Sequence, residues 1–299
     1  MGDGTHSPFV LSQPQASAGV PLLITSPHSG SDYPSDFLAA SLLDAHDIRQ
    51  SEDMYVDALY ADAPALGLPL LAARFPRAYL DLNRAPYELE QALFNDKLPD
   101  HIDTKSMRAA AGLGTVPRLV AENTPIYKAK LSFAEAEQRI EAIYHPFHAI
   151  LSQQLTTLHA AHGYSLLIDA HSMPSQATRL SGMGEIDFVL GNRHGRACHR
   201  DVTHIVESFL TSRGWHVGLN KPYAGGHITE QYGAPARGHH ALQIEINRSI
   251  YMDEASHEKN DDFDRLRQDM RELMAHLIAV LPDMADNLMA DTPSQSAAE

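Results

Sequence analysis

Short apolar runs alternate with longer segments of helical periodicity along this chain. The apolar runs occupy residues 20–27, 68–75, 164–170, 186–191, 215–220 and 240–247. Several of them are almost continuously apolar, which is typical of strands that are covered on both faces. The alternation of such strands with helices predicts an α/β fold.

The helical segments have recognisable ends. They cover residues 132–163, 198–214 and 260–281. Ser132 and Glu135 have the spacing of a capping box, and a glycine ends each of the first two segments. Pro146 lies inside the first segment, so we expect that helix to be kinked or divided there.

The rest of the chain offers no clear domain boundary. Residues 85–127 show little periodicity, and a stretch of that length inside a compact domain is usually functional or partly helical. No linker separates the chain into two parts, so we expect one domain over residues 1–299. The termini, 1–19 and 284–299, lack a pattern and are predicted to be loose.

Composition narrows the class of protein. The 299 residues are 43% hydrophobic and 20% charged, as in a soluble globular protein, and no apolar run approaches the length of a membrane span. The first residues lack the features of a secretory signal, so we expect a cytoplasmic protein. A formal charge of −15 opposes binding to nucleic acid or to an anionic membrane. An anionic small-molecule substrate would therefore need locally placed arginines.

One apolar run ends in a pair of side chains that suit a metal site. In YSLLIDAHSMPS, Asp169 and His171 are two residues apart and would face the same side of a strand. Asp169 could then accept the second ring N–H of His171, as carboxylates do beside a metal-bound histidine. Taken alone, Asp169 could equally be an ordinary polar residue at the end of a strand.

Two further apolar runs also end in residues with chemical potential. His28 follows the run in LLITSPHSG, and Glu245 closes the run in HALQIEINRS. Ligands of open α/β sheets bind in the crevice beyond the carboxyl ends of the strands. We therefore expect His28, His171 and Glu245 to lie close together.

A hydrolytic zinc site needs a third protein ligand. The acidic segment RQSEDMYVDALYADA offers Glu52, Asp53 and Asp57 at a predicted helix with apolar positions at helical spacing. Acidic residues in the first turn of a helix also compensate its dipole, so the pattern leaves the identity of the ligand open.

Seven ordered motifs together resemble one family. They are SPHSG, LDLNRAP, AAGLGTVPR, IDAHSMPS, DFVLGNRHG, NKPYAGGHITEQYG and LQIEINRSIYMDE. The chain resembles the N-formylglutamate amidohydrolases, also called deformylases, from about Val20 to Leu281. That resemblance implies a three-layer α/β/α fold with a mixed, mostly parallel sheet, related to zinc carboxypeptidases and aspartoacylases. It also implies hydrolysis of N-formyl-L-glutamate to formate and L-glutamate, the last step of one route of histidine degradation.

The resemblance also assigns roles to residues of the predicted metal site. His28 and His171 match the two histidine ligands of one Zn²⁺, or another divalent cation, and Asp53 matches the acidic ligand. Carboxypeptidase-like sites usually have a glutamate three residues after the first histidine, where this chain has Ser31. Glu52 and Asp32 therefore remain alternatives to Asp53.

Catalytic and substrate-binding residues follow from the same match. Glu245 corresponds to the catalytic glutamate, which would move a proton from water to the leaving amine. Arg84 matches an arginine that holds a substrate carboxylate. N-formylglutamate has two carboxylates, and the candidates for the second are Arg118, Arg77 and Arg193.

Two other functions remain open from the sequence. The same chemistry could act on another N-acyl amino acid or a small peptide, because the size of the acyl pocket is not readable. A non-catalytic carboxylate-binding protein on this fold is the second alternative. The sequence leaves the oligomeric state open.

Overall fold

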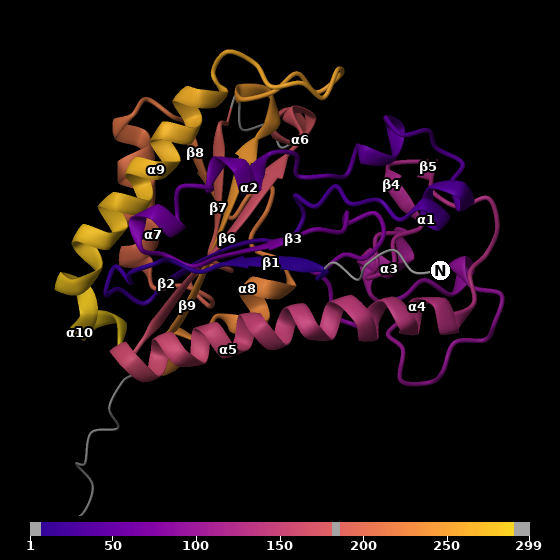
Figure 1. Cartoon of the computed structure of the whole chain (residues 1–299), viewed down its shortest axis with the longest axis horizontal. Coiled ribbons are helices and arrows are strands. Elements are labelled where there is room, and N and C mark those ends of the chain that lie inside the picture. The colour runs from indigo at the N-terminus through magenta and orange to yellow at the C-terminus, as the bar shows by residue number, and fades with distance from the viewer. Residues whose placement is uncertain (1–6, 181–185, 290–299) are drawn as a thin grey trace, which may run out of the picture.

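A mixed sheet of seven strands runs through the part of the chain that the computed structural model describes, residues 7–180 and 186–289 (Figure 1). In spatial order the strands are β1 (Phe9–Ser12), β3 (Leu70–Ala73), β2 (Leu22–Ser26), β6 (Ser165–Met173), β9 (His239–Asn247), β7 (Phe188–Gly191) and β8 (Val217–Leu219). The four strands from β3 to β9 are parallel, whereas β1 and β7 run antiparallel to their neighbours β3 and β9. The predicted mixed, mostly parallel sheet is confirmed.

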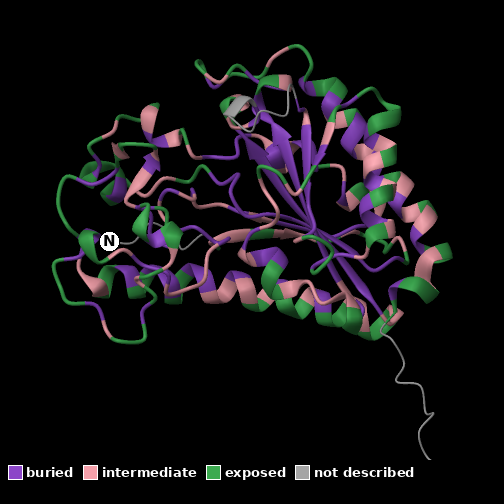
Figure 2. Cartoon of the chain, turned by 180° about the vertical axis from the view of Figure 1, so that it is seen from behind, coloured by how far each residue is buried: buried purple, intermediate pink, exposed green. Residues whose placement is uncertain are grey.

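Helices cover both faces of this sheet. One face packs against α2 (Val56–Leu59), α7 (Arg200–Ser212), α9 (Phe263–Val280) and α10 (Ala285–Leu288). The other packs against α1 (Ser35–Ala40), α4 (Phe133–Arg139), α5 (His145–His162) and α8 (His227–Tyr232). Figure 2 shows buried strands between helices whose outer sides are exposed. None of the helices in the described residues is long and apolar enough to cross a membrane.

The alternation of side chains along the strands decides which residues reach which core. On β6, Leu166 and Ile168 pack into the core with α9, whereas Leu167 packs into the core with α5. Successive side chains of a strand point to opposite faces, so Asp169 and His171 belong to the α5 face. The same count on β9 sends Gln243 and Glu245 to the α5 face, together with Ala241.

Each of the six predicted strands is present, with ends that differ by a few residues. The largest difference is at β6, which we expected to end at Ala170 and which continues to Met173. Pairing with β9 extends through this segment, from Ser165 opposite His239 to Met173 opposite Asn247. His171 therefore lies inside a paired strand, which fixes its backbone more firmly than a strand end would.

The long helical segment at 132–163 has the predicted ends and an unexpected middle. Ser132 and Glu135 form the capping box, and Gly163 ends α5 in a left-handed conformation. A π-helical turn over Ile140–Tyr144 separates α4 from α5, and Pro146 falls in the first turn of α5, where a missing N–H costs little. The other two helices run within 198–214 and 260–281, as α7 and α9.

Two expectations for the termini were wrong in part. Phe9–Ser12 forms the edge strand β1, paired with β3, although residues 1–19 were predicted to be loose. At the other end Ala285–Leu288 forms α10, and residues from 290 onward lie outside the described part.

The irregular stretch at 85–127 contains only short elements. They are a 3-10 turn (Gln91–Leu93), α3 (Met107–Ala110), β4 (Leu119–Ala121) and β5 (Thr124–Pro125), and α6 (Ser175–Leu180) is a similarly short helix after β6. The stretch is thus partly helical, as predicted.

Candidate metal and active site

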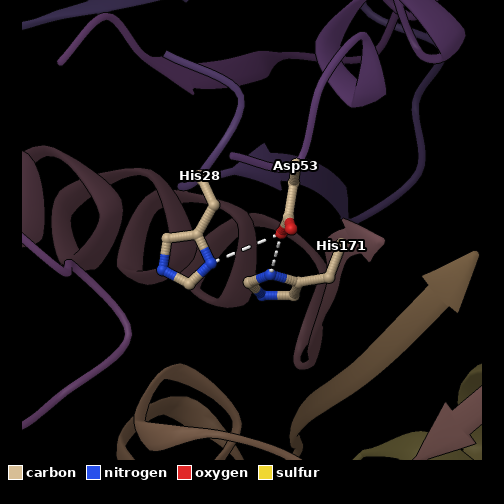
Figure 3. Close-up of side chains that lie close together, drawn as sticks. All are labelled: His28, Asp53 and His171. Atoms are coloured by element: carbon tan, nitrogen blue, oxygen red, sulfur yellow. Dashed lines mark hydrogen bonds and ion pairs between the residues drawn. The ribbon is translucent and has the colours of Figure 1, made fainter. Parts of the chain in front are cut away.

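Three buried side chains converge near the carboxyl ends of the parallel strands (Figure 3). Asp53 Oδ2 lies 3.0 Å from His171 Nδ1 and 3.4 Å from His28 Nδ1. One donor atom from each residue lies within 4.8 Å of the other two. The structure therefore brings together the two histidines and the acid that the sequence proposed.

The turn that carries His28 requires close approach of two backbone segments. A Cβ atom on Gly30 would lie 2.3 Å from the carbonyl oxygen of Phe75, so only glycine fits there. The main chain of Asp53 is tied to the same turn, because its N–H donates to the carbonyl of His28 at 3.0 Å. This bond holds the acid beside the first histidine.

A second carboxylate lies on the far side of each imidazole. His28 Nε2 is 2.7 Å from Asp81 Oδ1, and His171 Nε2 is 3.0 Å from Asp169 Oδ1. Ionised carboxylates only accept hydrogen bonds, so the contact with Asp81 places a proton on His28 Nε2 and leaves Nδ1 of that ring facing Asp53. In His171, Nδ1 donates to Asp53 Oδ2, and Nε2 lies against Asp169 and Asn83. The sequence predicted the role of Asp169 but missed Asp81.

Neighbouring groups hold the carboxylates of Asp81 and Asp53 in their ionised form. Burial alone would raise the pKa of Asp81, but Arg77, Arg84 and His28 hold it well below its usual value. Burial likewise opposes ionisation of Asp53, but the hydrogen bond from His171 and the nearby His28 ring bring its pKa well below the usual range. Both acids are thus negative at neutral pH.

The second oxygen of Asp53 is held by its own set of donors. Oδ1 accepts hydrogen bonds from Arg248 Nη2 at 3.0 Å and Ser172 Oγ at 3.2 Å. Arg248 also donates from Nε to Ser172 Oγ at 3.0 Å. These bonds leave Oδ2 to face the two imidazoles.

The donor set fits a divalent cation. Two imidazole nitrogens and one carboxylate oxygen make a three-ligand site of the kind that catalytic zinc uses. The Nδ1 atom of His28 is buried and has no hydrogen-bond partner among the described residues. Burial alone would lower the pKa of His171, but Asp169 and Asp53 raise it well above its usual value, so a cation would displace a proton there.

The local structure around Asp53 differs from the prediction. We expected one helix through Glu52, Asp53 and Tyr55, but α2 contains only Val56–Leu59. Tyr55, with a φ of 65°, adopts a left-handed conformation just before it. Asp53 therefore lies in an irregular turn, where its backbone can bond to His28.

The structure separates Asp53 from the two alternative ligands. Glu52 is buried, but its carboxylate is bound by Arg49, with contacts of 3.0 Å to each oxygen, and by Tyr33 at 3.1 Å. Asp32 is paired with Arg74 at 2.7 Å on the surface. Both side chains are thus committed elsewhere.

Glu245 lies beside the cluster without belonging to it. It is the register partner of His171 in the adjacent parallel strand and is buried on the same face of the sheet. Burial raises the pKa of Glu245 to about 7, although the His171 ring lowers it. Gln243 donates to Oε1 at 2.6 Å and so fixes the carboxyl group.

A cavity of about 840 Å³ opens in front of these residues. His28, His171 and Glu245 line it, together with Arg77, Arg84, Arg108 and Arg248. Two of the arginines proposed from the sequence do not line it: Arg118 is paired with Glu90 at 2.7 Å, and Arg193 with Glu230 at 2.6 Å.

Sequence reasoning missed four residues that shape the site: Asp81, Asn83, Gln243 and Arg248. Asp81 and Asn83 stand in LDLNR at the spacing of one strand face, and Gln243 stands two residues before Glu245. That spacing is a signal that could have identified Gln243. Asp81 lies in an irregular segment and Arg248 begins a 3-10 turn, where spacing carries no such information.

Asn83 joins two walls of the cavity. Its Nδ2 atom lies 3.0 Å from His171 Nε2 and 3.4 Å from Asp169 Oδ2, and its Oδ1 accepts from the N–H of Ile228 at 2.7 Å. A Cβ atom on Gly226 would lie 2.4 Å from Nδ2 of Asn83. The glycine pair in YAGGH thus makes room for a site residue.

Comparison with known proteins agrees with this arrangement. The family model of N-formylglutamate amidohydrolase matches residues 20–252. The chain belongs to this family. It is 34% identical over 238 residues to the N-formylglutamate deformylase of Pseudomonas putida, covering 79% of this chain and 83% of that protein. It is 31% identical over 266 residues to the N-formylglutamate deformylase of Pseudomonas aeruginosa, covering 87% and 93%.

Solved structures extend the family relation to the fold. The crystal structure of N-formylglutamate amidohydrolase from Ralstonia eutropha JMP134 matches with a TM-score of 0.87 and 35% identity, over 93% of this chain and 99% of that one. A gene product of Agrobacterium tumefaciens matches with a TM-score of 0.64 and 18% identity, over 92% and 95%, and at that identity shows a shared fold alone. The family resemblance and fold predicted from the motifs are confirmed.

Proposed function

We propose that this chain is a metal-dependent hydrolase that cleaves N-formyl-L-glutamate to formate and L-glutamate. The observation that carries the proposal is the buried cluster of His28, Asp53 and His171, with Glu245 in register beside His171. The names of its relatives in the amidohydrolase family support an amide substrate of this kind. A place in histidine degradation remains a prediction from the resemblance.

His28, Asp53 and His171 would hold the cation. Zn²⁺, when bound, supplies Lewis-acid polarisation of a carbonyl oxygen and makes water more acidic. Asp81 and Asp169 would keep the two imidazoles in the orientation that this binding needs, because each carboxylate lies against the ring nitrogen opposite the one that faces Asp53.

Glu245 would act as the general base and then as the general acid. With a pKa raised to about 7 by burial, its carboxylate can take a proton from the attacking water and return it to the departing nitrogen of glutamate. The hydrogen bond from Gln243 aims the carboxylate, so no rotation is needed between the two transfers.

Arg84 would hold the carboxylate next to the scissile amide. Its Nη2 atom lies 3.7 Å from Asp81 Oδ2, which places it next to the group that supports His28. Its Nε and Nη1 atoms donate to the carbonyls of Leu113 and Asn83, each at 2.9 Å. These bonds hold the guanidinium in place at the cavity.

The decisive assay is formate release from N-formyl-L-glutamate by the purified protein, compared with acetate release from N-acetyl-L-glutamate and with cleavage of a glutamyl dipeptide. We expect the formyl substrate to give the highest kcat/KM. A higher kcat/KM for the acetyl compound or the dipeptide would instead support an amidohydrolase of the same chemistry with another substrate. No turnover of any of them would support a non-catalytic binding protein.

A further inference from the structure

Three of the four arginines that line the cavity already use their donors within the protein. Arg77 pairs with Asp81 at 2.8 Å, and Arg84 bonds to two carbonyls. Arg248 donates from all three nitrogens, to Ser172, the carbonyl of Gln50 and Asp53. These three guanidinium groups are therefore already held in place by bonds within the protein.

Arg108 differs from them. It lines the same cavity, the residue is exposed, and no residue in the described part of the chain forms a hydrogen bond or ion pair with its guanidinium. Its positive charge lowers the pKa of Arg84, as does that of Arg77, in addition to the larger effect of burial. The positive charges of Arg84 and Arg108, both of which line the cavity, therefore repel each other.

The backbone that carries Arg108 is held firmly. Ser106 caps the short helix α3 by accepting from the N–H of Ala109 at 2.9 Å, and its hydroxyl also donates to Glu88. The turn after α3 is tied to Arg84 through the carbonyl of Leu113. The backbone of Arg108 is thus held beside the cavity, and its guanidinium is left to meet a ligand.

We propose that Arg108 binds the side-chain carboxylate of the substrate and so selects N-formylglutamate over N-formyl amino acids with uncharged side chains. The inference rests on the proposed function, because it assigns a partner to the second carboxylate of that substrate. The two carboxylates of the substrate would meet the guanidinium groups of Arg84 and Arg108 in the cavity and so offset the repulsion between them.

The chemistry of the substrate decides which arginine meets which carboxylate. The α-carboxylate is attached to the carbon that bears the formamide, so it must stay near the metal ligands. Arg84, next to Asp81, is placed for that group. The γ-carboxylate is two methylene groups farther away, which suits the exposed and unpaired Arg108.

The test compares N-formyl-L-glutamate with N-formyl-L-glutamine, which has nearly the same shape without the second charge. It uses the wild type, Arg108→Gln and Arg108→Lys, with Lys105→Gln as the control. Lys105 is an exposed cation three residues earlier that does not line the cavity, so its loss reports the effect of net charge alone.

We expect Arg108→Gln to lower kcat/KM for N-formylglutamate by about 10- to 100-fold, mainly through KM, as for the loss of one charge-assisted ion pair. Its kcat/KM for N-formylglutamine should change less than about threefold, which also shows that the variant is folded. Arg108→Lys should recover part of the preference, and Lys105→Gln should retain all of it.

Equal losses on both substrates, or an unchanged preference in Arg108→Gln, would overturn the assignment of Arg108. The proposed function is judged separately, by the wild type alone. If the wild type cleaves neither formyl compound, the proposed function fails; if it prefers N-formylglutamate and the variant keeps that preference, only the role of Arg108 fails.

Discussion

The two sides of the cavity are built differently. On the sheet side, His171 and Glu245 lie in paired strands, their side chains are buried, and carboxylates or amides fix their orientation. On the opposite side, Arg108 lies on a short helix in an irregular stretch, exposed and without a partner among the described residues. The first side is complete without substrate, and the second is not.

This structural difference corresponds to two different functions, bond cleavage and substrate recognition. Bond cleavage needs groups held within a fraction of an ångström, which strands and buried hydrogen bonds provide. Recognition of a particular side chain needs a group that can exchange water for a ligand, and such groups are usually found on loops. Substitutions on the sheet side should therefore affect turnover or stability, and those on the other side should affect selectivity.

The largest effect is expected for Glu245→Gln. Loss of the general base should lower kcat by about 10²- to 10⁴-fold, while the metal content stays that of the wild type. Formate release and metal analysis of the same sample check this. A variant with nearly normal kcat would remove Glu245 from its catalytic role.

Truncating a side chain in the core beneath the sheet side of the cavity should cause the largest loss in the free energy of unfolding. Leu242 is fully buried on β9, on the face opposite Glu245, and Leu242→Ala should lower the free energy of unfolding by about 2–5 kcal/mol. The matched change on the other side, Met107→Ala, removes a side chain that is 90% exposed and should change it by less than about 0.5 kcal/mol. Denaturant unfolding measures the free energy of unfolding of both variants. Similar losses in the two would contradict the proposed difference between the two sides of the cavity.

The carboxylates of Asp81 and Asp169, which contact the two imidazoles, should affect the affinity for the metal. Asp81→Asn and Asp169→Asn should each weaken Zn²⁺ binding by about 10- to 100-fold, because the imidazole loses the negatively charged carboxylate that orients it and raises its basicity. Competition with a chelator of known affinity gives the Kd. An unchanged Kd in either variant would mean that its carboxylate serves packing alone.

The smallest effect is expected where α3 is capped. Ser106→Ala removes the N-cap, so α3 should fray and Arg108 should be held less firmly, at a local cost of about 0.5–2 kcal/mol. We expect a severalfold rise in KM for N-formylglutamate and none for N-formylglutamine. A rise for both substrates would indicate wider damage to the cavity.

The difference between the two sides of the cavity also explains which site residues could be predicted from the sequence. Along β6 the period of two placed Asp169 and His171 on one face, because a strand converts spacing into direction. Glu245 was expected near them because it closes another apolar run, and the register of β9 against β6 places it beside His171. Asp53 was proposed on a helix and instead lies in a turn next to His28. The acidic segment was correctly expected to bring Asp53 to the two histidines. The helix on which that expectation was based does not include Asp53.

The arginines were the least predictable part. Arg118 and Arg193 were chosen for their motifs, but each meets a glutamate that is distant in the sequence. Arg108 was overlooked because SMRAA carries no pattern, and only the folded chain places it at the cavity. Contacts between irregular segments depend on tertiary packing, which periodicity cannot report.

The central claim is that the cluster of His28, Asp53 and His171 binds a divalent cation on which turnover depends. The most direct measurement is formate release from N-formyl-L-glutamate by protein dialysed against a chelator, followed by titration with Zn²⁺. We expect the dialysed protein to be inactive and activity to return in proportion to bound metal, up to one equivalent per chain. Full activity in a sample shown to be free of metal would contradict the claim.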